Sequence, residues 1–242
     1  GVTRVQIGVQ TTHDHLLKKI NRKCYSIDTK RALYLLKNAG FKILCHFMPN
    51  LPGSTPELDI EMFDTIIDDP NFDCDEWKLY PTSVTTTSNK DIEDVNTVIE
   101  KWFIEGKYIP YSNEELKEVL KHALRNVKIH TRISRIFRDI PIDNIIGGAR
   151  TPHLRQVLQN EMDEEGDYCK CIRSREIKDR EFEMKDVFYL IEDYEASYGT
   201  EYFISANIIN KENSDLPYLI GFCRLRLRNY NKVNICLLYT SD

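Results

Sequence analysis

The stretch "SIDTKRALYLLKNAGFKILCHFMP", residues 26–49, places a helix directly before an apolar strand, and this order decides the fold. Ser26 or Asp28 is a typical first residue of a helix, and Gly40 is typical of the position just after a last turn. The segment 41–49 that follows is rich in apolar and aromatic residues, as strands are. The stretch therefore predicts one helix-strand unit.

Similar units flank this stretch. Strands are predicted at 3–10 ("TRVQIGVQ") and 77–82 ("WKLYPT"), and a helix is predicted to begin near Pro56. A further helix at 113–127 precedes an alternating strand at 128–137. Strands and helices that alternate in this way form a parallel sheet with right-handed crossovers, in a barrel of repeated units or an open α/β sheet.

The pattern changes after a boundary that we place near residue 150. Segments 182–196, 200–209 and 216–229 are predicted to be successive antiparallel strands, because turn residues separate them. In the last of them, period-two alternation puts three arginines on one strand face, which we expect to be the charged outer face of a sheet: Arg224, Arg226 and Arg228.

Composition and charge narrow the function classes. The 242 residues are 41% hydrophobic and 29% charged, and no apolar run approaches the roughly 20 residues of a membrane span. The formal charge of −5 excludes a uniformly basic coat, but segment 117–138 holds three Lys and four Arg against one acid. Seven scattered cysteines do not suggest a disulfide framework, and we expect a reducing, cytoplasmic location.

Several motifs in register resemble one family. "GVTRVQIGVQT", "INR", "GFKILCHFMPNLPGST", "KLYPT", "TRISRIFRDIP" and "CKCIRSREI" are similar to segments of the catalytic subunit of the Elongator complex, over residues 1 to about 235. The resemblance implies the second half of a radical S-adenosylmethionine (SAM) partial (β/α) barrel at 1–149. It also implies a linker with a candidate zinc site at 150–180 and the first strands of a GNAT-type α+β acetyltransferase domain at 181–235.

The resemblance further implies site residues on the barrel. Lys78 and Tyr80 of "KLYPT" are expected in the reaction cavity. Polar groups at the carboxyl ends of barrel strands are placed for chemistry, although glutamines there can simply cap a strand. The residues expected on the SAM side are Gln6, Gly8, Gln10, Asn21 and Arg22.

Three arginines in the basic segment are candidates for binding tRNA phosphates: Arg132, Arg135 and Arg138. Their spacing of three would scatter them over both faces of a straight strand, so we expect some of them on the following loop. The alternative is a solvated basic edge.

The pair Cys169 and Cys171 raises the question of a metal. In the family, the linker holds a structural zinc and many members carry a third cysteine at the position of Ser174. His153 and Cys223 are the candidates for the remaining ligands, since zinc takes four nitrogen or sulfur ligands. The alternative is a pair of reduced thiols without metal.

Two motifs of the family are missing. No three cysteines are spaced as a [4Fe-4S] loop requires, and no glycine-rich loop is present to hold the pyrophosphate of acetyl-CoA. We therefore expect an internal fragment that is inactive by itself. Its last residues, 236–242, resemble a translated sequencing adapter, so genuine sequence is expected to end near Ile235.

The resemblance implies a tRNA uridine(34) acetyltransferase, which uses SAM-derived radical chemistry and acetyl-CoA to carboxymethylate the wobble uridine. The cofactors are then a [4Fe-4S] cluster, SAM, acetyl-CoA and zinc, and the partners are tRNA and, in eukaryote-like cells, other Elongator subunits. The alternatives are another radical SAM enzyme with an appended domain, or a tRNA-binding module without catalysis.

Overall fold

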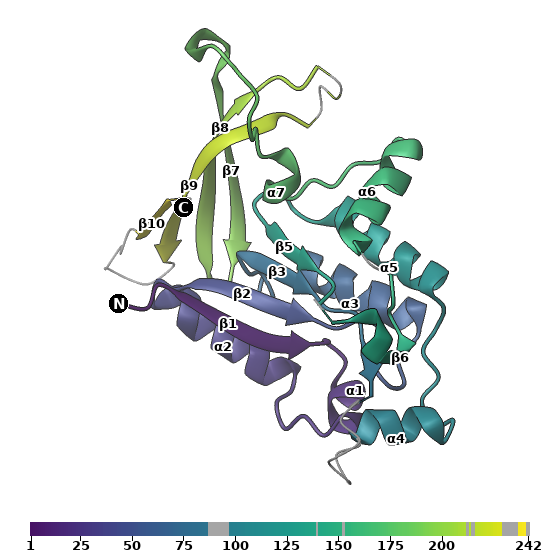
Figure 1. Cartoon of the computed structure of the whole chain (residues 1–242). Coiled ribbons are helices and arrows are strands. Elements are labelled where there is room, and N and C mark those ends of the chain that lie inside the picture. Colours follow the sequence, from purple (N-terminus) through teal and green to yellow (C-terminus); the bar gives the residue numbers. More distant parts are fainter. Residues whose placement is uncertain are drawn as a thin grey trace.

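The computed structural model describes residues 1–86, 97–138, 140–151, 153–211, 213, 216–228 and 237–240. Figure 1 shows a parallel sheet with its helices in the lower part of the molecule and an antiparallel sheet standing above it. Within the described residues no helix is long and apolar enough to cross a membrane.

The parallel sheet has the strand order β1-β2-β3-β5. Its strands are β1 (Arg4–Gln10), β2 (Lys42–Phe47), β3 (Glu76–Leu79) and β5 (Arg132–Ile136). Helix α2 (Ser26–Asn38) connects β1 to β2, α3 (Pro56–Asp68) connects β2 to β3, and α5 (Asn113–Asn126) precedes β5. This arrangement confirms the predicted parallel α/β sheet.

The starts of these helices follow from their sequence. Pro56 is the first residue of α3, as predicted, and the Thr55 hydroxyl accepts the Leu58 N–H at 3.3 Å. In α2, Ser26 is the first residue and the Asp28 carboxylate accepts the Tyr25 N–H at 2.9 Å. Each side chain thus satisfies a backbone donor that has no partner inside the helix.

One face of the parallel sheet packs on the helices and forms the main core. Alternate residues of β2 and β3 are buried there, including Cys45, Phe47 and Trp77. They contact apolar residues of α3 such as Phe63, whose ring stacks on Trp77 with centroids 6.2 Å apart. Because side chains alternate along a strand, the other positions of the same strands point to the opposite face.

Short elements complete this part of the molecule. They are α1 (Asp14–Lys19), β4 (Ser83–Thr85), α4 (Val98–Ile104), the 3-10 turn η1 (Ile142–Asn144), β6 (Ile145–Gly148), α6 (Leu154–Glu164) and α7 (Ile172–Arg175). Strands β4 and β6 pair with each other in antiparallel fashion. Figure 1 shows α6 and α7 near β5.

The antiparallel sheet has the order β10-β9-β8-β7. Its elements are η2 (Met184–Asp186), β7 (Phe188–Ala196), β8 (Gly199–Ile208), β9 (Tyr218–Arg228) and β10 (Leu237–Thr240). The predicted antiparallel strands are confirmed, whereas their assignment to an acetyltransferase domain stays a prediction. Of the predicted adapter segment, β10 pairs with β9, and Cys236 lies outside the described residues.

The expectation that the arginines of β9 form a charged outer face is wrong for two of them. Arg224 and Arg226 are 3% and 0% exposed. Arg224 forms an ion pair with Asp75, which precedes β3, and Arg226 lies 2.9 Å from Glu201 of β8. Alternation correctly placed both on one face, but the parallel unit covers that face and supplies Asp75 to Arg224, while Glu201 of the neighbouring strand β8 pairs with Arg226.

Candidate functional site at the carboxyl ends of the parallel strands

A row of registered residues, which carries polar side chains on β2, β3 and β5, crosses the sheet on the face opposite the core. Gly8 of β1 is registered with His46 of β2, His46 with Lys78 of β3, and Lys78 with Arg135 of β5. Neighbouring parallel strands place registered residues on the same face. Four strands therefore contribute to one surface, near the ends where their carboxyl termini meet.

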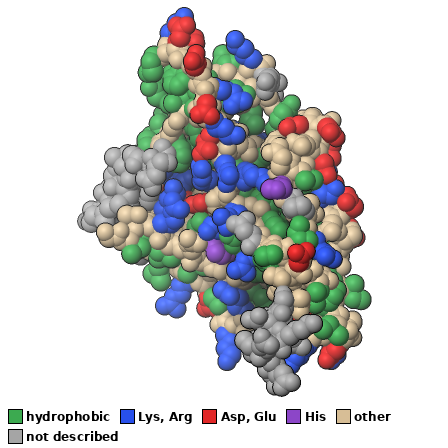
Figure 2. Space-filling model, in the orientation of Figure 1, with side chains coloured by type: hydrophobic (Ala, Val, Ile, Leu, Met, Phe, Trp, Pro, Cys, Tyr) green, Lys and Arg blue, Asp and Glu red, His purple; other side chains and the backbone are tan. Residues whose placement is uncertain are grey.

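A bulge in β5 brings two of the predicted arginines to this face. Trp77 is registered with Ile133 and Lys78 with Arg135, so that Ser134 is one extra residue in β5. Arg132, opposite Glu76, and Arg135, opposite Lys78, consequently share a face despite their spacing of three. Figure 2 shows Lys and Arg side chains gathered across the middle of the molecule.

Gln6 links the row by hydrogen bonds. Its Oε1 accepts from Lys78 Nζ at 3.2 Å and lies 3.1 Å from Nε2 of His46. A neutral His46 can donate there if its proton is on Nε2. Tyr80, after β3, meets the His46 ring edge-on with centroids 5.4 Å apart, and the Arg138 guanidinium lies 5.8 Å from the Tyr80 ring centre.

The electrostatics of the row keep His46 uncharged. Partial burial, Lys78 and Arg138 together lower the pKa of His46 from its ordinary value. Burial and neighbouring positive charge both disfavour the imidazolium. A neutral imidazole therefore stands between cations at neutral pH.

The row opens into a cavity of about 830 Å³. Its lining includes Gln10, His46, Tyr80, Arg135 and Arg138. The structure thus brings together predicted residues from the SAM side, the reaction cavity and the tRNA-binding set. Lys78 is connected to this cavity through Gln6, which contacts both Lys78 and the lining residue His46.

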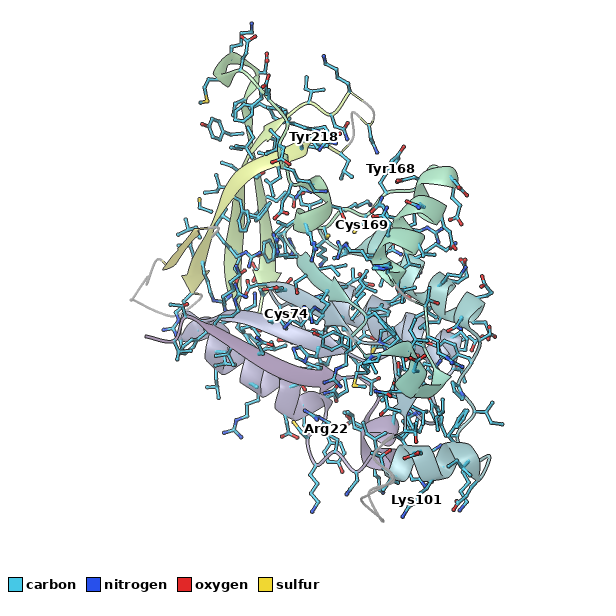
Figure 3. All side chains as sticks on the ribbon, viewed as in Figure 1. Arg22, Cys74, Lys101, Tyr168, Cys169 and Tyr218 are labelled. Atoms are coloured by element: carbon cyan, nitrogen blue, oxygen red, sulfur yellow. The ribbon has the colours of Figure 1, made fainter. Side chains whose placement is uncertain are left out.

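A second cavity of about 530 Å³ adjoins the first. Its lining includes Asn21, Arg22, the α4 side chain Trp102, and two residues that it shares with the first cavity: Gln10 and Met48. Figure 3 labels Arg22 beyond the end of β1. Gln10, Asn21 and Arg22, which lie up to twelve positions apart in sequence, are therefore brought to one place.

Gly8 leaves room for two side chains that line the smaller cavity, Gln10 and Arg22. A Cβ at Gly8 would lie 2.6 Å from Nε2 of Gln10 and 2.9 Å from Nη2 of Arg22. Arg22 Nη2 donates to the Gly8 carbonyl at 2.5 Å. Gln10 adopts φ of 72°, and its buried Oε1 has no partner among the described residues. The unpartnered Gln10 acceptor and the Arg22 cation thus both line the smaller cavity.

The cysteine pair lies away from these cavities, in the segment before α7 (Figure 3). Cys169 and Cys171 are 2% and 0% exposed. The Cys171 sulfur and burial raise the pKa of Cys169. Cys171 is buried as well, but a hydrogen bond from Cys169 and the Arg155 cation, whose Nη2 is 3.7 Å from its Sγ, lower its pKa.

The expected four-ligand zinc set is not assembled. Within the described part of the chain, no three His, Cys, Asp or Glu side chains gather as a metal site. His153 is exposed at the start of α6, and Cys223 is registered with Ile204 inside the antiparallel sheet. Ser174 Oγ lies 3.4 Å from Cys171 Sγ. Of the four expected ligands, the structure brings only Cys169 and Cys171 together, and zinc binding stays a prediction.

Sequence reasoning missed two groups of residues. His46 was read only as part of a strand, although its register with Lys78 would follow from aligning the strand ends. Arg155 and Arg173 were given no role, because the β5 carbonyls that they contact lie 22 and 39 positions away in sequence.

The chain matches known families over most of its length. It matches the Radical SAM superfamily at residues 1–66 and the Radical_SAM C-terminal domain at residues 74–164. It is 37% identical to the tRNA uridine(34) acetyltransferase of Methanocaldococcus jannaschii over 232 residues, covering 93% of this chain and 40% of that protein. It is 34% identical to human Elongator complex protein 3, covering 93% of this chain and 40% of that protein.

A solved structure agrees with this relationship. Archaeal Methanocaldococcus infernus Elp3 with an N-terminal deletion superposes with a TM-score of 0.82 at 35% identity. The match covers 96% of this chain and 53% of that chain. The chain thus spans about two fifths of the length of the curated relatives that it matches.

Proposed function

Because the chain belongs to the radical SAM family of Elongator complex protein 3 and the tRNA uridine(34) acetyltransferases, we propose that it forms part of an enzyme that modifies the wobble uridine of tRNA. The observation that carries this proposal is the polar row that opens into the larger cavity. Such strand-end clusters are where barrel enzymes hold their reacting groups.

The residues at the smaller cavity fit SAM. Its methionine moiety carries an ammonium and a carboxylate, which match the free Gln10 acceptor and the Arg22 cation. Gly8 leaves the space in which these two side chains meet, and Asn21 contributes a further polar group. Gln6 belongs to the set through its contacts with Lys78 and His46. When bound to a reduced [4Fe-4S] cluster, SAM supplies the radical that begins the chemistry.

Lys78 and Tyr80 are the groups that we assign to the reaction cavity. Gln6 accepts a hydrogen bond from the Lys78 ammonium. The neighbouring His46 is neutral and therefore adds no second positive charge beside Lys78. Lys78 can then orient or protonate an anionic group, and the Tyr80 ring offers a face against which a uracil base can stack. No described cysteines form a group of three, so no residue is assigned to the cluster.

The remaining assignments follow the relatives. Residues 181–235 are assigned to the start of an acetyltransferase domain, and acetyl-CoA would bind beyond the residues named here. Arg135 and Arg138, at the rim of the larger cavity, are assigned to tRNA phosphates. A cytoplasmic location, Elongator partner subunits and zinc at Cys169 and Cys171 belong to the same proposal. Elemental analysis of purified protein tests the zinc.

Binding of RNA tests the proposal at the level of this chain. Fluorescence anisotropy with a labelled tRNA should show an affinity that falls with salt. In Arg135→Ala/Arg138→Ala, the slope should decrease by about one unit per lost phosphate contact. Lys107→Ala is the control, because Lys107 is 67% exposed and paired with Glu105, near α4. No detectable binding, or equal slopes in all three proteins, would contradict the proposal.

A further inference from the structure

A second basic cleft lies beside the larger cavity, where β5, α6 and α7 meet. It has a volume of about 710 Å³. Its charged lining consists of Arg132, Arg155, Arg173, Lys178 and one carboxylate, Glu176. Four cations thus face a single acid in one concave place.

Two arginines of this cleft, Arg155 and Arg173, are held in position by backbone carbonyls. Arg155 Nη1 donates to the Ile133 carbonyl at 2.8 Å, and Arg173 Nη1 donates to the Ser134 carbonyl. These backbone oxygens belong to consecutive residues of β5. They orient both guanidinium groups, but a carbonyl supplies only a dipole. The buried Cys171 sulfur, whose pKa Arg155 helps to lower, offsets part of the charge of Arg155.

The single acid does not neutralise the cleft. Glu176 pairs with Arg132. Lys178 and Arg173 are exposed and Arg155 is half-buried, so a ligand can reach them. Fixed arginines in an open cleft suit phosphate oxygens, because a guanidinium offers two parallel donors.

The cleft continues the surface of the larger cavity. The β5 bulge places Arg132 and Arg135 on one face, and Arg135 and Arg138 line the cavity. Arg132 therefore connects the two basic groups along one strand. The band of Lys and Arg side chains in Figure 2 crosses this face of the molecule without a break by a large acidic patch.

We infer that the cleft formed by Arg132, Arg155, Arg173 and Lys178 binds backbone phosphates of the same RNA whose base enters the larger cavity. This inference rests on the proposed function and extends it from the predicted Arg132 to three further residues: Arg155, Arg173 and Lys178. A chain of phosphates matches cations that β5, α6 and the α7 segment bring to one cleft, whereas a single small anion would contact only some of them.

The experiment measures the salt dependence of tRNA binding for Arg173→Ala/Lys178→Ala in the 242-residue chain. Both side chains are exposed and neither supports the core, so the variant should keep the thermal midpoint of the parent. The slope of log affinity against log salt should decrease by about one to two units. Lys107→Ala should keep the parental slope.

Three outcomes separate the claims. A reduced slope in Arg173→Ala/Lys178→Ala supports the cleft. A parental slope in this variant, together with a reduced slope in Arg135→Ala/Arg138→Ala, overturns the cleft and leaves the proposed function standing. Failure of the parent chain to bind tRNA overturns both. A parallel titration with coenzyme A distinguishes the phosphate source: loss of coenzyme A binding in the variant with unchanged tRNA binding would also overturn the inference.

Discussion

Lys37 Nζ lies 3.0 Å from Glu201 Oε1, although the two residues are 164 positions apart in sequence. Both side chains are about 2% exposed. Lys37 belongs to α2 of the parallel unit and also contacts Asp73 at 2.8 Å, whereas Glu201 belongs to β8 and also contacts Arg226. Burial opposes the charge on Lys37, but Asp73 and Glu201 raise its pKa overall. A buried ionic network therefore joins the two sheets.

Replacing Lys37 should weaken the whole molecule. Lys37→Ala leaves the Asp73 and Glu201 carboxylates short of a cation in a buried place, which costs about 3–5 kcal/mol of unfolding free energy. Lys30→Ala is the matched control on the same helix, because the Lys30–Asp69 pair is partly exposed and contributes about 1 kcal/mol or less. Urea unfolding measures both. Equal losses in the two variants would show that the network is not what joins the sheets.

Gly148 is required by a close backbone contact. Its φ is +77°, and an added Cβ would lie 2.3 Å from the Thr82 carbonyl oxygen. Gly106 has a similar φ of +69° but nothing within 4 Å. Gly106→Ala should therefore cost only the left-handed strain of about 1–2 kcal/mol. Gly148→Ala should cost about 1–3 kcal/mol more. Thermal unfolding compares them, and similar midpoints would refute the contact.

The charge on His46 should respond to Lys78. Because Lys78 is among the groups that lower the pKa of His46, Lys78→Gln should raise that pKa toward its ordinary value. Titration of the His46 ring protons by NMR measures the change. Lys107→Gln is the control and should leave the titration of His46 unaltered. A downward shift in Lys78→Gln, or none, would contradict the electrostatics of the row.

The sign of the effect on stability follows from the same shift. A histidine with a lowered folded pKa binds more protons when unfolded, so it favours folding above the unfolded pKa of about 6.5 and loses this contribution as pH falls. Lys78→Gln should therefore reduce the fall of stability between about pH 7 and about pH 5. A steeper fall in the variant would argue against this cause.

The sequence allowed the parallel unit to be predicted because its signals are local. The cap residues and Pro56 mark helix starts, and the apolar run 41–49 marks a central strand. The burial of Arg224 could not be predicted, since its partner Asp75 lies 149 positions away and only the docking of the two sheets brings them together.

The site was predictable to a similar extent. Gln10, Tyr80, Arg135 and Arg138 line one cavity, because parallel strands end at one edge, whereas their roles stay predictions. The bulge at Ser134 was not visible in the spacing of the arginines. His153 and Cys223 were chosen as zinc ligands by residue type, which gives no information about distance. That they do not join the cysteine pair could therefore not be predicted.

The most direct test of the central claim uses a chimera. This chain would replace the matching segment of Methanocaldococcus infernus Elp3, which is 35% identical over 96% of the chain. Mass spectrometry of tRNA after anaerobic incubation with SAM and acetyl-CoA should detect carboxymethylated uridine at position 34, and Lys78→Ala in the chimera should abolish it. A folded chimera that binds tRNA and SAM yet leaves the uridine unmodified, or one in which Lys78→Ala keeps full activity, would contradict the account.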